Sequence, residues 1–237
     1  MTGEPGPPVI TIDGPAGAGK SPVGRAVAAE LGLDYLDTGA MYRAVTLAAL
    51  RRGSDPHSID EVADVAKEID LAVVDRSVLI DGVDAATEIR SREVTGAVSA
   101  VAANSAVRTE MVARQRDWVA ERGGGVVEGR DMGSVVFPDA DMKLFVTASA
   151  RERAERRVAE AGGHVDEVER SIIERDRKDS SRADSPLIEP QGSTLVDTTG
   201  IAFVDVVSMV VDLVRRGVSG GSTEQDESDD SGATVGR

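Results

Sequence analysis

The feature that most constrains the fold is a glycine-rich run, G-P-A-G-A-G-K-S, at residues 14–21. An apolar, β-branched run precedes it and predicts a buried strand over roughly residues 8–13. Residues 23–31 predict a helix, which we expect to stop at Gly32. A strand, a glycine loop and a helix in this order are typical of an open α/β domain with a parallel sheet.

The same run fits the pattern G-x-x-x-x-G-K-[ST], which is a phosphate-binding loop (P-loop). Glycines let successive backbone N–H groups point at a phosphate, and the helix N-terminus adds partial positive charge. Lys20 is expected to reach the β- and γ-phosphates, and the Ser21 hydroxyl is expected to bind Mg²⁺. A plain glycine turn is the alternative, but the flanking strand and helix argue against it. The predicted ATP-binding residues are Gly14, Pro15, Ala16, Gly17, Ala18, Gly19, Lys20, Ser21 and Pro22.

Pro22 departs from the usual pattern, because many P-loops carry Thr at the position directly after this serine. Proline is tolerated in the first turn of a helix. It nevertheless removes one N–H that would otherwise face the α-phosphate of a bound nucleotide. We therefore expect weaker nucleotide binding.

Composition limits the possible partners. The chain has 237 residues and a net charge of −15, which argues against nucleic acid or an anionic membrane as its main partner. An anionic substrate stays possible because a pocket can gather arginines. The absence of cysteine excludes disulfides and thiolate catalysis. Without an apolar run of membrane-spanning length or a signal-peptide pattern, the cytoplasm is the expected location.

Charged residues follow two further predicted strands. Residues 33–37 are followed by Thr38 and Arg43, and the strand at residues 126–127 is followed by E-G-R-D-M-G. The carboxyl ends of parallel strands line the ligand crevice of an open sheet, so these residues are candidates for a second ligand. For Arg43, an exposed position on a helix is the alternative that spacing alone favours. For Arg130 and Asp131, between two glycines, we favour a ligand-binding role.

A β-containing insertion is predicted in the first half of the chain. Residues 58–61 form a capping-box pattern, and residues 71–74 and 78–80 read as a hairpin with a turn near Asp75 and Arg76. A helical region over 91–122 is expected to break near Asn104, with Ser105 capping the next helix. Ser99 and Arg108 flank this break, and they face either a cleft or solvent. The insertion is either a mobile substrate-binding subdomain or a decoration.

Residues 150–182 are rich in arginine and are interrupted by two glycines. They form either a solvated helical hairpin or a lid whose arginines close over polyphosphate. The last strand is expected at residues 195–197, and the closing helix at residues 203–213. Residues 1–7 are expected to be flexible, and residues 217–237 to form a disordered acidic tail.

Four motifs, in matching order and spacing, resemble bacterial cytidylate kinases: the P-loop, D-T-G-A-M-Y-R at 37–43, E-G-R-D-M-G-S-V-V-F-P at 128–138, and D-S-S-R at 179–182. The run at residues 128–138 is highly specific for this family. The resemblance covers about residues 8–215. It implies an α/β P-loop nucleoside monophosphate kinase fold within a single domain, residues 8–216. That fold has a five-stranded parallel sheet with helices on both faces. It also has a small β-containing NMP-binding insertion at about 60–105 and a helical lid at about 150–182.

The resemblance also implies a site and a reaction, the transfer of the ATP γ-phosphoryl group to CMP or dCMP with Mg²⁺. The implied ligands of the CMP phosphate are Arg43, Arg130 and Arg182. The implied cytosine-reading group is Ser99, Arg108 and Asp131. The implied ribose contacts are Arg175 and Asp179, and Thr38 lies near the acceptor. The implied catalytic residues are Lys20 with the lid arginines Arg153 and Arg157. Pro22 stands where the family usually has Thr.

We expect a cytoplasmic monomer that binds these small molecules, with no nucleic-acid or membrane partner. Another small-molecule kinase on the same scaffold remains an alternative, as does a nucleotide-binding regulator without catalysis. A GTPase would need an Asn-Lys-x-Asp guanine-binding motif, but the single asparagine, Asn104, is followed by Ser105.

Overall fold

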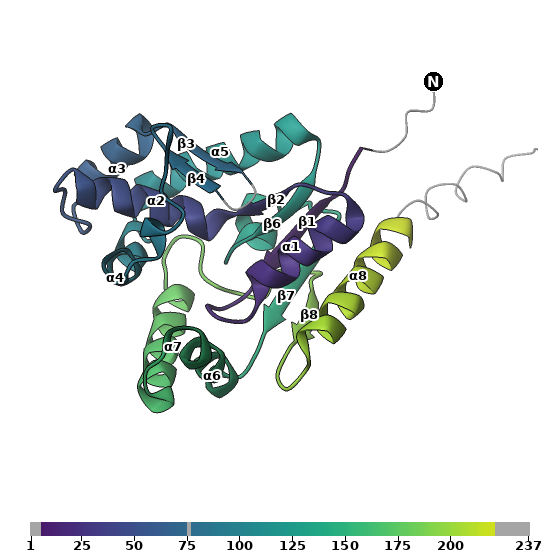
Figure 1. Ribbon diagram of the computed structural model, residues 1–237. Coiled ribbons are helices and arrows are strands. Elements are labelled where there is room, and N and C mark those ends of the chain that lie inside the picture. Colours follow the sequence, from purple (N-terminus) through teal and green to yellow (C-terminus); the bar gives the residue numbers. More distant parts are fainter. Residues whose placement is uncertain (1–5, 75–76, 221–237) are drawn as a thin grey trace, which may run out of the picture.

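The computed structural model describes residues 6–74 and 77–220, and it contains a five-stranded parallel sheet in the order β2-β6-β1-β7-β8 (Figure 1). All the strand pairs in this sheet are parallel. The strands are β1 (Val9–Asp13), β2 (Tyr35–Asp37), β6 (Gly125–Glu128), β7 (Met142–Thr147) and β8 (Thr194–Asp197). This arrangement confirms the predicted parallel α/β core.

Helices cover both faces of the sheet, because its central strands are apolar on both sides. One face packs against α1 (Lys20–Leu31) and α8 (Phe203–Gly220), and the other packs against α2 (Thr38–Arg51) and α5 (Ser105–Arg122). In β1, Ile10 and Ile12 are fully buried in the core on the α1 side. The P-loop joins β1 directly to α1 and therefore lies at the carboxyl edge of the sheet, as predicted.

The insertion between α2 and α5 contains its own antiparallel sheet in the order β3-β4-β5. Its elements are α3 (Ile59–Glu68), β3 (Leu71–Val74), β4 (Ser77–Ile80), β5 (Val83–Asp84), the 3₁₀ turn η1 (Glu88–Arg90) and α4 (Arg92–Val101). The predicted hairpin is present with an additional short strand. Its turn near Asp75 and Arg76 lies outside the described residues.

Helix α3 begins where the capping-box pattern predicts, with Ser58 at the N-cap position. The predicted capping bonds are wrong, because Ser58 makes no side-chain capping bond and the Glu61 carboxylate accepts from the Asp55 N–H instead. The predicted Ser105 cap is also wrong. The side chain that caps α5 is Asn104, whose Oδ1 accepts from the N–H groups of the second and third helical residues. Ser105 is already the first residue of that helix, and its hydroxyl bonds to Asp184.

Helices α6 (Ala150–Ala161) and α7 (Val165–Ser180) pack on each other and form the arginine-rich hairpin below the sheet in Figure 1. Helix α8 continues to Gly220, so the first residues of the predicted disordered tail are helical. The rest of the predicted tail lies outside the described residues, as do residues 1–5.

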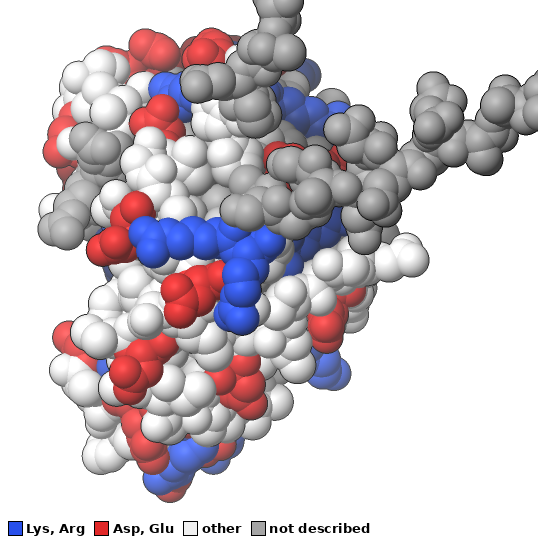
Figure 2. Space-filling model, turned by 90° about the vertical axis from the view of Figure 1, so that its right-hand side faces the viewer, with Lys and Arg blue, Asp and Glu red and all other residues white. Residues whose placement is uncertain are grey.

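The surface carries both signs of charge. On the face shown in Figure 2, basic side chains gather near the centre and acidic side chains lie around them and below. No helix in the described part of the chain is long and apolar enough to cross a membrane.

Candidate active site

A cavity at the carboxyl edge of the sheet brings together residues that are far apart in the sequence. We call it the arginine cavity. Its lining comes from the P-loop, the start of α2, η1, α4, α5, the segment after β6, α6, α7 and the residues after α7. All the residues predicted for the acceptor line it, namely Thr38, Arg43, Ser99, Arg108, Arg130, Asp131, Arg175, Asp179 and Arg182.

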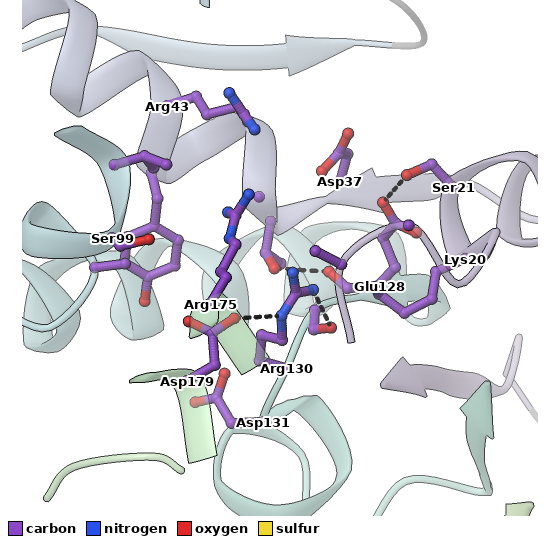
Figure 3. A pocket seen from close by; sticks show the side chains of 18 of the residues that line it. Lys20, Ser21, Asp37, Arg43, Ser99, Glu128, Arg130, Asp131, Arg175 and Asp179 are labelled. Atoms are coloured by element: carbon purple, nitrogen blue, oxygen red, sulfur yellow. Dashed lines mark hydrogen bonds and ion pairs between the residues drawn. The ribbon is translucent and has the colours of Figure 1, made fainter. Parts of the chain in front are cut away.

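One end of the arginine cavity is built around a buried ion pair. Arg108 on α5 bonds to Asp131, and both side chains are almost fully buried. Burial raises the pKa of the Asp131 carboxyl above its ordinary value, and the Arg108 charge opposes that rise. The Tyr42 ring lies 5.6 Å from the Arg108 guanidinium and supports it from α2. Sequence reasoning missed Tyr42 as a site residue, although it immediately precedes Arg43. Ser99 completes this end from α4 (Figure 3).

A second carboxylate, Asp179, organises the middle of the cavity (Figure 3). Its Oδ2 accepts from Arg130 Nε at 3.1 Å, and its Oδ1 accepts from Arg182 at 2.6 Å. Asp179 is 1% exposed, so both bonds form away from water, where such charge-assisted bonds are strong. This aspartate therefore fixes two of the three predicted phosphate ligands.

Arg43 and Arg175 are held differently. The Arg43 guanidinium donates to the Ile89 carbonyl at 3.2 Å and to Thr95 Oγ1 at 3.0 Å. Burial and the nearby Arg175 charge lower the pKa of Arg43 to about 10, and burial and Arg130 lower the pKa of Arg175. Among the described residues, neither arginine forms an ion pair with a carboxylate. A bound dianion would relieve the repulsion within this cluster.

The P-loop forms the opposite wall. Lys20 is 7% exposed, and its Nζ donates to the Pro15 carbonyl at 2.8 Å within the loop. The Ser21 hydroxyl donates to Glu128 Oε1 at 2.5 Å, a contact between residues 107 positions apart. Burial raises the pKa of Glu128 and lowers the pKa of Lys20. Gly14 is required here, because a Cβ at this position would lie 1.9 Å from the Val146 carbonyl oxygen.

Glu128 is a site residue whose contact with the P-loop the sequence analysis did not anticipate. It is 4% exposed at the end of β6, beside the strand that carries the P-loop, and its Oε2 finds no hydrogen-bond partner among the described residues. Asp37 also lines the cavity. A hydroxyl with one or two carboxylates suits Mg²⁺, which usually completes its shell with waters and nucleotide phosphates. The described residues contain no group of three or more His, Cys, Asp or Glu side chains able to hold a metal alone.

A second cavity, which we call the P-loop cavity, lies between the P-loop, α6 and the start of α8. Six of the predicted ATP residues line it, namely Gly17, Ala18, Gly19, Lys20, Ser21 and Pro22. Three of these six also line the arginine cavity: Gly17, Lys20 and Ser21. Ala16 lines the arginine cavity alone. Gly14 and Pro15 form the start of the loop and line neither cavity.

The two predicted lid arginines have different surroundings. Arg153 is buried, forms an ion pair with Asp176 at 2.7 Å, and donates to the Ala16 carbonyl at 3.1 Å. Arg157 lines both cavities and, among the described residues, pairs with no carboxylate. Arg156, which the sequence analysis did not single out, donates to Thr198 and so joins α6 to the end of β8.

Known proteins resemble this chain over nearly its whole described length. The family model described as cytidylate kinase matches residues 10–216. The cytidylate kinase of Mycobacterium leprae (strain Br4923) is 46% identical over 213 residues, which covers 88% of this chain and 96% of that protein. The cytidylate kinase of Limosilactobacillus fermentum (strain NBRC 3956 / LMG 18251) is 45% identical, covering 87% of this chain and 95% of that protein.

The bifunctional pantoate ligase/cytidylate kinase of Synechococcus sp. (strain WH7803) is 46% identical over 88% of this chain but only 44% of its own length. Among solved structures, a gluconokinase from Sinorhizobium meliloti 1021 aligns with a TM-score of 0.52 and 16% identity, covering 93% of this chain and 98% of that one. That likeness concerns the fold alone. The family model over residues 10–216 and the two relatives that are 45–46% identical over most of both chains show that the chain belongs to the cytidylate kinase family.

Proposed function

We propose that this chain transfers the γ-phosphoryl group of ATP to CMP or dCMP, giving ADP and CDP or dCDP. The observation that carries the proposal is the arginine cavity itself. It gathers every residue predicted for the acceptor, and Lys20 and Ser21 of the P-loop form part of its lining. An acceptor held in this cavity would therefore lie directly beside the phosphates of a nucleotide held by the loop.

The two ends of the cavity suit the two ends of a pyrimidine monophosphate. Cytosine presents an amino donor next to ring and carbonyl acceptors, and the Asp131 carboxylate and Arg108 guanidinium offer the complementary groups. Uracil would instead turn a carbonyl oxygen toward Asp131. We assign Ser99 to the base as well, Arg175 and Asp179 to the ribose, and Arg43, Arg130 and Arg182 to the phosphate. Thr38 lies beside the acceptor, with its hydroxyl bonded to the Glu128 carbonyl.

The reaction then needs no general base. A phosphate oxygen of the acceptor, already ionised at neutral pH, attacks the γ-phosphorus in line. The bond from the γ-phosphorus to the β,γ-bridging oxygen breaks, and its electron pair leaves with ADP. Lys20 and Arg157 would stabilise the charge on the transferred group, because both line the two cavities. Arg153 would fasten the lid to the P-loop backbone through the Ala16 carbonyl.

Magnesium would enter with ATP. Ser21 would hold the ion through its hydroxyl, oriented by Glu128, and the ion would neutralise the β- and γ-phosphates. We further propose that residues 60–105 act as the NMP-binding unit and residues 150–182 as a lid. We also propose a cytoplasmic monomer, and the net charge of −15 argues against a nucleic-acid or anionic-membrane partner.

The test is an acceptor panel. ADP release from ATP and Mg²⁺ is measured with CMP, dCMP, UMP, AMP and shikimate in turn. Turnover is expected to be fastest with CMP or dCMP. Preference for shikimate or another acceptor would favour a different small-molecule kinase, and ATP binding without turnover on any acceptor would favour a regulator.

The same assay tests the P-loop. Lys20→Ala should lower kcat by about 10³-fold, because the γ-phosphoryl group loses a charge that acts in a buried site. Lys67→Ala is the matched control, since Lys67 is an exposed lysine on α3. Both variants should keep the thermal unfolding midpoint of the parent protein. Near-normal turnover by Lys20→Ala would contradict the assignment of the P-loop.

A further inference from the structure

The point where phosphoryl transfer would occur can be located from the two cavities. If the P-loop cavity holds the donor phosphates and the arginine cavity holds the acceptor, as proposed above, the transferred group passes where their linings coincide. Three basic side chains line both cavities: Lys20, Arg90 and Arg157. Lys20 comes from the P-loop, Arg157 from the lid helix α6, and Arg90 from η1 in the insertion. The P-loop, the insertion and α6 thus each supply one cation to the region where the two cavities meet.

We propose that Arg90 is a catalytic residue that contacts the transferred phosphoryl group. This inference rests on the proposed function and adds a residue to it. Arg90 is a separate case from the arginines assigned to CMP, because it lines the P-loop cavity and they do not. Its role would be to neutralise negative charge on the equatorial oxygens of the γ-phosphoryl group as the bond to ADP breaks.

The backbone around Arg90 is held by its neighbours, whereas its side chain is exposed. Ile89 is fully buried, and its carbonyl accepts a hydrogen bond from Arg43. On the other side of Ile89, Glu88 forms an ion pair with Arg51 of α2 at 2.8 Å. The turn is therefore fastened to the helix that also carries Arg43, a predicted ligand of the acceptor phosphate. Binding of the acceptor phosphate by Arg43 would hold Arg90 in register with it.

The Arg90 side chain keeps the freedom to engage a ligand. It is 60% exposed, and its nearest carboxylate is Asp37, at 3.7 Å from NH2 to Oδ2. That separation is longer than a hydrogen bond, so the pair costs little to break. By contrast, Arg130 and Arg182 are committed to Asp179, and Arg153 is committed to Asp176. Arg90 is therefore an exposed cation where the two cavities meet, and its one ion pair is weak.

The experiment compares Arg90→Gln with Arg92→Gln. Arg92 is exposed two positions further along the chain and lines neither cavity, which makes it a matched control. Arg90→Gln should lower kcat about 100-fold and change the KM values for CMP and ATP less than about threefold. Arg92→Gln should stay within about twofold of the parent enzyme. Arg90→Lys should recover only part of the loss, because lysine lacks the planar fork.

A second measurement separates catalysis from structure. Added guanidinium ion should raise the turnover of Arg90→Ala and leave Arg92→Ala unchanged. A kcat for Arg90→Gln within threefold of the parent value would overturn the proposal, as would a loss confined to the KM for CMP. An absence of rescue by guanidinium would also overturn it. Failure of the proposed function is distinguishable, because the parent enzyme and Arg92→Gln would then show no turnover with CMP.

Discussion

The proposed acceptor side, which is the arginine cavity, and the proposed donor side, which is the P-loop, hold their charged groups in different ways. In the arginine cavity, buried aspartates bind three of the arginines, with Asp131 on Arg108 and Asp179 on both Arg130 and Arg182. On the donor side, Lys20 is bonded to a carbonyl of its own loop and Ser21 to Glu128.

This difference suggests how each ligand would be received. The three arginines that the aspartates hold would lose little freedom if CMP bound there as proposed. The donor-reading groups would have to exchange bonds within the protein for bonds to ATP and Mg²⁺. A carboxylate removed from the acceptor side should therefore have a larger effect than a backbone change on the donor side.

The largest of these effects is expected for Asp179→Asn. An asparagine can accept from one arginine, but its amide N–H₂ would face the other, and the neighbouring Arg175 would lose a compensating charge. We expect kcat/KM for CMP to fall about 100-fold, which corresponds to about 3 kcal/mol. Steady-state kinetics would measure it.

Glu174→Gln provides the control for this prediction. Glu174 lies on the same helix, α7, and forms an exposed ion pair with Lys178, so little change is expected. If Asp179→Asn and Glu174→Gln had the same kcat/KM for CMP, the pre-oriented acceptor side would not exist in the proposed form.

A smaller and more selective effect is expected for Arg108→Met. Methionine retains the bulk of the side chain but removes the donor that would read cytosine. We expect the ratio of kcat/KM for CMP to that for UMP to fall about tenfold or more, with a smaller change in the rate with UMP. Equal losses with CMP and UMP would contradict the base-reading role.

Folding has to be checked for this variant, because Asp131 would be left as a buried charge without its partner. The double variant Arg108→Met/Asp131→Asn removes that charge as well. It should regain thermal stability relative to Arg108→Met without regaining the preference for CMP.

Much of this arrangement could be predicted from the sequence, because the carboxyl ends of parallel strands meet at one edge of a sheet. The P-loop after β1, Thr38 after β2 and Arg130 after β6 are adjacent for that reason. The family motifs then supplied Arg175 and Arg182 on and after α7, whose approach to the sheet no local pattern indicates.

Other features depend on contacts that a sequence pattern does not record. The bond between Ser21 and Glu128 joins the start of α1 to the end of β6, and it requires the register of β1 against β6. In the sequence, nothing distinguishes Arg90 from other exposed arginines. Its position beside the P-loop is visible only in the folded insertion. Asn104 caps α5 in place of the predicted Ser105, because its Oδ1 accepts from two backbone N–H groups.

On the donor side, Pro22→Thr should have a modest effect. Helix α1 begins at Lys20, and its first intrahelical bond here runs from the Val23 N–H to the Gly19 carbonyl, so Pro22 costs the helix no bond. It removes only an N–H that would face a ligand in the P-loop cavity. Threonine should lower the KM for ATP about threefold, the worth of one modest hydrogen bond.

Pro22→Ala separates the two contributions of threonine, because alanine restores the N–H without adding a hydroxyl. The KM for CMP should stay the same in both variants. An unchanged KM for ATP in both would remove the idea that Pro22 weakens donor binding.

The smallest effect concerns Asp13, a carboxylate that no arginine partners among the described residues. Asp13 is fully buried at the end of β1, and its oxygens accept from the Met132 and Gly133 N–H groups. Burial raises its pKa from 3.8 to about 6, so the folded state holds this proton more tightly than the unfolded chain does. The resulting stabilisation is present below about pH 4 and is lost as the pH rises through 6.

Asp13→Asn removes this titration, although it also loses one accepting oxygen and should be less stable throughout. Between pH 5 and pH 7.5, the free energy of unfolding of the parent protein should therefore fall by about 1 kcal/mol relative to the variant. Urea unfolding of both proteins at the two pH values measures the difference. A gap that stays constant with pH would mean that the two N–H groups fully offset the cost of burying the Asp13 carboxylate. The contrast between paired and unpaired carboxylates would then fail at this site.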